Sequence, residues 1–140
     1  MPFDRERYVG LAGFRSALRH FLAASEAISR ASGITAQQYQ ALLAIGCGPD
    51  PMTMKDLAEH LLLQQHTATQ MVDRLEKAGL VDRAPSPTDG RSVVLTLTEA
   101  GAVLLADLAE QHLVEMLKQE PQLSRSLRRL KPGAPDLDRK

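Results

Sequence analysis

The spacing of apolar residues changes once along this chain, and that change constrains the fold more than any other feature. Up to Gly79 the apolar residues recur at steps of three and four, which is the period of amphipathic helices. Residues 80–98 then alternate with a period of two in the runs LVDRA and SVVLTLT, which are joined by the loop PSPTDGR. Because proline cannot donate a ladder hydrogen bond, the prolines of this loop confine pairing to the flanking runs. The pattern predicts a mainly α protein with a small β-hairpin that has a long, projecting tip.

Helix-start and helix-stop residues divide the rest of the chain. Thr35, Thr53 and Thr98 are N-cap candidates, because a threonine hydroxyl can accept a hydrogen bond from the first helical turn. We expect Pro121 to separate the last long helix from a short basic helix at 123–130, and Gly101 to mark close packing of that long helix. The expected helices are 4–31, 36–45, a short helix after Thr53, 65–78 with Ala68, Met71, Val72, Leu75 and Ala78 on one face, and a long helix after Thr98.

Length and composition indicate one globular domain. The chain has 140 residues, of which 44% are hydrophobic and 24% charged. It begins with the charged stretch MPFDRERYVG and contains no run of about 18 apolar residues, so we expect a cytoplasmic protein without a membrane span. The single cysteine, Cys47, excludes an intrachain disulfide, and no histidines join it at metal-ligand spacing. No phosphate-binding glycine loop or Gly-x-Ser-x-Gly elbow occurs, so we expect neither an enzyme nor a cofactor or metal site.

Two short helices followed by a hairpin match the plan of a winged helix-turn-helix domain. The outward face of the helix at 65–78 begins QQHTATQ, which is polar and almost uncharged. Glutamine can pair with adenine, and threonine can contact thymine, in a major groove. On the hairpin loop, an arginine could enter a minor groove. The candidate DNA-binding residues are Gln64, Gln65, His66, Thr67, Thr69, Gln70 and Arg74 on the helix, with Asp89 and Arg91 on the loop.

The charge balance argues against this interpretation. The formal net charge of the chain is zero, and residues 54–92 carry five basic side chains against six acidic ones. A polar helix face is also commonly a solvated surface with no further task. The alternative hypothesis is therefore a winged-helix protein-interaction module, or a co-regulator, that has lost DNA binding.

Three motifs carry a resemblance to a known family. They are VDRLEKAGLV at residues 72–81, Asp-x-Arg at 89–91 and Leu-Thr-x-x-Gly at 97–101. With the text between them, residues 57–101 resemble the multiple-antibiotic-resistance regulator (MarR) family of bacterial transcription factors. The resemblance implies a homodimer on a pseudo-palindromic operator, with recognition helices in major grooves and wing arginines in minor grooves. It also implies repression that a small, often aromatic, ligand relieves.

The resemblance and the apolar faces together predict the domain organisation. The terminal helices have apolar surfaces broader than a small winged domain would cover, which favours a dimer interface over an intrachain helical core. We therefore expect residues 1–140 to form a single domain of this family. Its parts are dimerisation helices at 4–31 and 99–131, a winged helix-turn-helix at 35–98 and a flexible tail at 132–140.

Three residues depart from the family pattern or stand apart from it. Leu62 occupies a turn position where the family often has glycine, and a left-handed conformation there would cost a leucine about 1 kcal/mol. Either the turn avoids positive φ or the preceding helix runs on slightly. Gln64 stands where the family often has a serine or threonine N-cap. Some relatives sense oxidants through cysteine, but Cys47 lies between two glycines with no neighbouring cysteine, which favours a buried or inert thiol.

Overall fold

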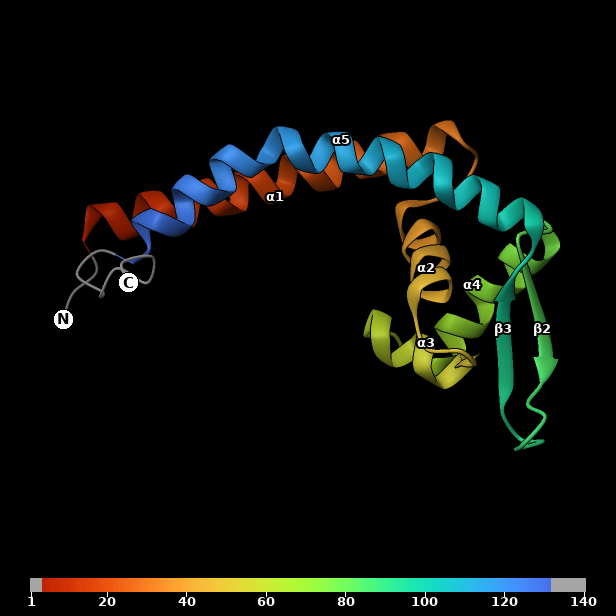
Figure 1. Cartoon of the computed structure of the whole chain (residues 1–140). Helices are drawn as coiled ribbons and strands as arrows, with labels where there is room; N and C mark the ends of the chain where they lie inside the picture. Colours follow the sequence, from red (N-terminus) through yellow and green to blue (C-terminus); the bar gives the residue numbers. More distant parts are fainter. Residues whose placement is uncertain (1–3, 132–140) are drawn as a thin grey trace. The chain divides into compact units, whose positions relative to one another are not determined.

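A computed structural model describes residues 4–131, which fold into two compact units (Figure 1). One unit combines the residues up to Ala27 with those from Gln111 onward, and the other is Ile28–Glu110. The predicted tail at 132–140 lies outside the described residues. Over residues 4–131, no helix has both the length and the apolar character needed to cross a bilayer.

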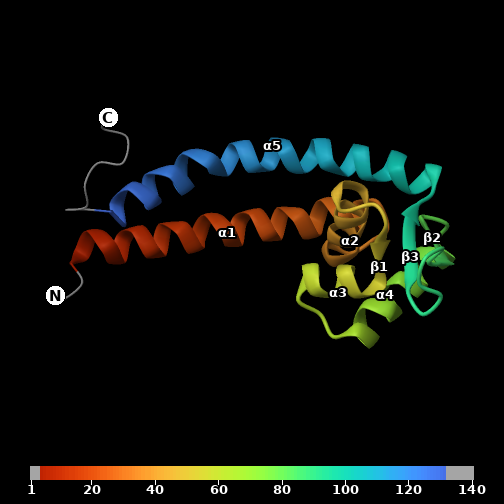
Figure 2. The same cartoon turned by 60° about the horizontal axis from the view of Figure 1, so that its bottom comes forward.

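The first unit is a helix pair. It contains most of α1 (Arg5–Ala31) and the second half of α5 (Glu99–Arg129), which lie side by side in both views (Figures 1 and 2). A hydrogen bond of 2.7 Å joins Ser25 Oγ to His112 Nε2, and both residues are buried. The helix expected at 4–31 is confirmed.

Helix α5 continues through Pro121, so the expected break into two helices is wrong. A proline inside a helix costs about 3 kcal/mol, because it removes one hydrogen bond and crowds the preceding turn. Packing beyond the proline opposes that cost. Ser126 is buried against α1, where a Cβ added at Gly10 would lie 2.9 Å from the Ser126 carbonyl oxygen. The missing side chain at Gly10 therefore lets the two helices approach closely enough to hold the end of α5 in place.

The second unit has the expected winged arrangement, with one addition. Its hairpin is confirmed, but a two-residue strand, β1, also pairs with β3 and gives the strand order β1-β3-β2. Met52 lies opposite Leu95 in that pairing. Two residues are too few to show alternation, which is why the sequence pattern missed β1. The elements of this unit are α2 (Ala36–Cys47), β1 (Met52–Thr53), α3 (Met54–Leu61), α4 (Gln65–Lys77), β2 (Val81–Pro85), β3 (Val93–Leu97) and the start of α5.

Threonine caps begin the helices as the sequence predicts. The Thr53 hydroxyl accepts a hydrogen bond from the Asp56 N–H at 3.0 Å, and the Asp56 carboxylate accepts one from the Thr53 N–H at 3.2 Å. Thr98 accepts from the Gly101 N–H at 3.0 Å and donates its hydroxyl to the Gly79 carbonyl at 2.6 Å. The start of α5 is thereby tied to Gly79, which follows the C-cap of α4 and has a φ of 78°.

Close packing at Gly101 is confirmed. A Cβ there would collide with the carbonyl group of Leu80, which precedes β2. The core of the unit is drawn from α2, α3, α4, the hairpin and α5, and its most deeply buried apolar side chains are Leu42, Leu57, Val72, Leu75, Val81, Leu95 and Leu108.

The inward face of α4 is nearly as predicted. Ala68, Met71, Val72 and Leu75 are buried, whereas Ala78 is exposed because the helix ends at Lys77. Since these four residues anchor α4 in the core, the helix cannot rotate, and its opposite face is held toward solvent.

Candidate nucleic-acid interface

The outward face of α4 presents the predicted polar side chains. Thr67 and Thr69 are half-buried, and the Thr69 hydroxyl donates to the Gln65 carbonyl at 2.9 Å. Thr69 can therefore only accept a hydrogen bond from a ligand through this oxygen. The exposed members of the predicted set on this helix and its N-cap are Gln64, Gln65, His66, Gln70 and Arg74.

The turn before α4 is left-handed. Leu62 has φ 57° and ψ 42°, and its side chain is 92% exposed. The turn therefore does not avoid positive φ, and α3 ends at Leu61 instead of running on. Gln64 is the N-cap residue but makes no side-chain capping hydrogen bond. Helix α4 thus begins at Gln65 with no side chain capping its first-turn N–H groups.

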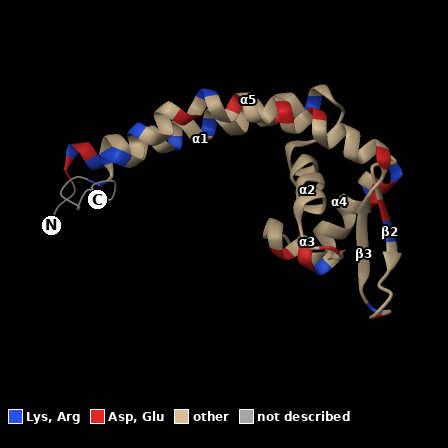
Figure 3. Ribbon diagram, in the orientation of Figure 1, with Lys and Arg blue, Asp and Glu red and all other residues tan. Residues whose placement is uncertain are grey.

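The tip of the hairpin is shaped by Asp89. Its Oδ1 accepts the Arg91 N–H at 3.1 Å, and its Oδ2 accepts the Ser92 hydroxyl at 3.1 Å. The Ser86 hydroxyl in turn accepts the Asp89 N–H at 3.1 Å. Asp89 therefore holds the loop through backbone and hydroxyl groups, while the Arg91 side chain is exposed. Figure 3 shows basic and acidic positions together at this tip.

Arg83 links the hairpin to α4. Its Nη2 lies 2.7 Å from Asp73 Oδ1 and 2.9 Å from Glu76 Oε1. Desolvation lowers the pKa of the Arg83 guanidinium, but the hydrogen bond and charge of Glu76, together with those of Asp73, outweigh it and raise that pKa above its ordinary value. Sequence reasoning missed this residue, although a pair of acids three apart on a helix, followed by a strand arginine, was the available signal.

A hollow of about 300 Å³ lies where α3, α4 and the hairpin meet. It brings together three of the predicted residues, Gln65, Thr69 and Arg91, and adds Lys55, which the sequence analysis did not select. None of its lining residues is an aspartate or glutamate, so a chain of zero net charge has a locally basic concave surface here. The full lining is Thr53, Met54, Lys55, Gln65, Thr69, Arg83, Arg91, Ser92 and Val93.

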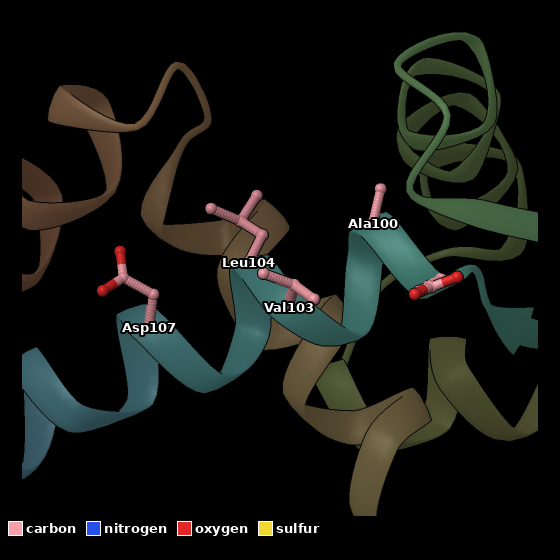
Figure 4. Close-up of a pocket in the computed structure, with 5 residues that line it drawn as sticks. Ala100, Val103, Leu104 and Asp107 are labelled. Carbon is pink, nitrogen blue, oxygen red and sulfur yellow. The ribbon is translucent and has the colours of Figure 1, made fainter.

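A second hollow, of about 770 Å³, lies along the first turns of α5 (Figure 4). Ala100, Val103 and Leu104 form its apolar floor, and the carboxylates of Glu99 and Asp107 flank it. Acidic flanks disfavour a polyanion such as DNA, so the basic hollow beside the hairpin is the better candidate interface.

Of the two alternatives expected for Cys47, a buried or an inert thiol, its exposure overturns the buried one. It lies at the end of α2 and lines neither the basic hollow nor the hollow along α5. The thiol therefore belongs to no part of the candidate interface.

Comparison with known proteins shows similarity to one family of transcriptional regulators. Residues 32–92 match the model of the MarR family. Over 71 residues the chain is 44% identical to the organic hydroperoxide resistance transcriptional regulator of Bacillus subtilis. This match covers 51% of this chain and 48% of that protein. The chain spans about half the length of the curated relatives it matches.

Solved structures extend the likeness over nearly the whole chain. AbsC, a MarR family transcriptional regulator from Streptomyces coelicolor, has the same fold with a TM-score of 0.75, at 22% identity over 94% of both chains. A mutant of Escherichia coli MarR complexed with operator DNA gives a TM-score of 0.65 and 26% identity, covering 86% of this chain and 79% of that one.

Proposed function

The chain belongs to the MarR family, and from that premise we propose that it is a transcriptional repressor that binds a pseudo-palindromic DNA operator as a homodimer. The observation that carries this proposal is the basic hollow, which unites Gln65 and Thr69 of α4 with Arg91 of the hairpin and contains no carboxylate. A DNA-bound regulator of this kind acts in the cytoplasm and needs no catalytic residue.

In the proposed complex, α4 enters the major groove. A groove about 12 Å wide admits one helix, and the exposed amides of Gln65 and Gln70 can pair with adenine edges. The hairpin then carries Arg91 toward the adjacent minor groove, where the negative potential is strongest when the groove is narrow. Asp89 holds the backbone N–H of Arg91 and so positions the arginine without contacting DNA itself.

Two substitutions test the two grooves separately. Arg91→Ala should weaken operator binding and reduce its dependence on salt, because a cationic contact is lost. Gln70→Ala should relax sequence preference with little change in the salt dependence. Fluorescence anisotropy with the intergenic DNA upstream of the gene, titrated against salt, measures both effects, and Arg5→Ala on α1 is the control. Equal binding by the wild type and both variants would refute the assignment.

The dimer is proposed from the first unit. Although α1 and α5 pack together, they leave large apolar side chains in solvent, including Leu117 at 63% exposure and Tyr8 at 62%. An apolar hollow of about 350 Å³, lined by residues of α1 and α5 that include Phe21 and Met116, continues this surface. A monomer gains nothing from such exposure, whereas a second copy would bury it.

Light scattering after size exclusion should report twice the chain mass of 15.3 kDa. Leu117→Glu should lower that mass and weaken operator binding. A wild-type protein that stays monomeric at micromolar concentration would contradict the dimer.

We also propose that a small aromatic effector releases the protein from its operator. Titration of the protein–operator complex with phenolic compounds tests this proposal.

A further inference from the structure

We propose that the basic hollow is a seat for one phosphate of the DNA backbone, and that Lys55 is its principal ligand. This inference rests on the proposed function. If α4 occupies a major groove and Arg91 the adjacent minor groove, the strand that separates those grooves must cross the surface between them. That surface is the hollow, and its volume of about 300 Å³ accommodates a phosphate group with flanking sugar.

The lining of the hollow has the charge that a phosphate requires. Lys55, Arg83 and Arg91 line it, and no aspartate or glutamate does. The chain as a whole has 17 basic and 17 acidic side chains, so this separation of charge is local. A concave surface with one sign of charge concentrates its field on a bound ion.

The three cations are not equally available. Arg83 is held by the carboxylates of Asp73 and Glu76, at 2.7 and 2.9 Å. Arg91 lies on the hairpin tip, from which it is proposed to reach the minor groove. Lys55 is exposed, and no hydrogen bond or ion pair of its ammonium group is found within residues 4–131. A lysine ammonium is a compact point charge that suits a phosphate oxygen.

The hydroxyl groups that line the hollow also favour the side on which Lys55 lies. The Ser92 hydroxyl donates to Asp89 and the Thr69 hydroxyl to the Gln65 carbonyl, so neither hydrogen is free. The Thr53 hydroxyl accepts from the Asp56 N–H and keeps its own hydrogen for a further acceptor. Thr53 and Lys55, at the start of α3, both line the hollow, so they can donate to one phosphate together.

Asp56 does not oppose this arrangement, although it is adjacent to Lys55 in the sequence. Its carboxylate accepts the Thr53 N–H at 3.2 Å in the capping box and is absent from the lining of the hollow. The capping box therefore engages the neighbouring acid, which does not line the hollow.

Salt titration of Lys55→Gln tests the proposal on the full-length protein. Each phosphate contact contributes about 0.9 to the slope of log K against log salt concentration, so a dimer should lose about 1.8. Between 50 and 200 mM salt, the affinity of the wild type should consequently fall about tenfold more than that of the variant. Sequence preference should not change, because a phosphate contact does not distinguish bases.

Lys118→Gln is the matched control, because Lys118 is an exposed lysine of α5 in the other unit and pairs with Glu115 at 3.8 Å. Its salt slope should equal that of the wild type. Unchanged thermal melting of Lys55→Gln shows that the variant is folded. A salt slope for Lys55→Gln equal to that of the wild type, with binding still dependent on Arg91, overturns the phosphate seat alone. Failure of the wild type to bind any operator DNA overturns the proposed function and the seat together.

Neutral methylphosphonate linkages, introduced one at a time into the operator, locate the contact. One linkage per half-site should weaken the wild type but leave Lys55→Gln unaffected, since the charge pair is already lost in that variant. Equal weakening of both proteins at every linkage contradicts the proposal. Inorganic phosphate distinguishes a free anion from DNA: saturable binding of it at millimolar concentration by the wild type, abolished in Lys55→Gln, would assign the hollow to a free anion instead.

Discussion

Replacement of Arg83 by methionine removes the clamp between the hairpin and α4, which is the pair of ion contacts from Arg83 to Asp73 and Glu76, while keeping an unbranched apolar chain about as long as the arginine's aliphatic stem. The three side chains of the clamp are partly exposed, at 29% for Arg83, 41% for Asp73 and 40% for Glu76. Exposed ion pairs contribute about 0.2–1 kcal/mol each, so Arg83→Met should lower the free energy of unfolding by about 0.5–2 kcal/mol. The loss should shrink as salt is added, because exposed charges are screened.

Operator binding should suffer more than stability. Without Arg83, α4 carries two uncompensated carboxylates, and the hairpin that positions Arg91 loses its anchor on α4. Both changes should weaken the binding of DNA, which is a polyanion. Neutralising the acids with Asp73→Asn and Glu76→Gln in the Arg83→Met background should recover part of the affinity by removing the repulsion.

Urea denaturation followed by circular dichroism measures the stability term, and anisotropy with operator DNA measures the binding term. A mutant cycle isolates the clamp from the packing of the Arg83 stem. Arg83→Met should cost almost nothing when Asp73→Asn and Glu76→Gln are already present, because no partner remains. An equal cost in both backgrounds would show that the arginine acts only through packing, and the reasoning about the clamp would be wrong.

Two further substitutions test the backbone geometry of the winged unit by thermal or urea denaturation. Leu62→Gly should leave the free energy of unfolding unchanged or raise it by up to about 1 kcal/mol. Relief of the left-handed conformation offsets the added flexibility of glycine, and the leucine side chain is almost fully exposed. A clear loss of stability would mean that Leu62 packs against the protein in solution. Gly101→Ala should destabilise by about 1–3 kcal/mol, since its Cβ would meet the Leu80 carbonyl. Gly90→Ala is the matched control, with open space around the added methyl group, and a similar loss there would contradict the packing argument.

Several features could be predicted because they depend on residues close together in the sequence. Thr35, Thr53 and Thr98 each accept a hydrogen bond from an N–H three residues ahead, so a short stretch of sequence determines each cap. The change to alternation after Gly79 identifies the hairpin for the same reason, since β2 and β3 are joined by a single short loop.

The departures at Pro121 and Leu62 show the limit of that local reasoning. Pro121 ends a helix by its own preference, but contacts made by Ser126 with α1, more than a hundred residues earlier, keep α5 continuous. Leu62 prefers negative φ, yet the turn that joins α3 to α4 holds it at 57°. At Pro121 tertiary packing overrides a local preference of about 3 kcal/mol, whereas at Leu62 local helix-end hydrogen bonds, such as that from the Leu63 N–H to the Ala58 carbonyl at 2.9 Å, accompany a conformation that costs about 1 kcal/mol.

The sequence by itself determined the order of the helices, the hairpin, the outward face of α4 and the arginine at the hairpin tip. It could not decide whether a chain with no surplus of basic residues has a surface for DNA. The number of charged residues along the chain does not say which of them lie close together in the folded protein. Asp56 and Asp89 accept local hydrogen bonds, in the first turn of α3 and in the hairpin tip, but only the tertiary structure brings Asp73 and Glu76 of α4 to Arg83 of the hairpin and gathers Lys55, Arg83 and Arg91 around one hollow. Electrostatic energy depends on distance in space, so the hollow that contains Lys55 and Arg91 is basic although the sequence around it is not.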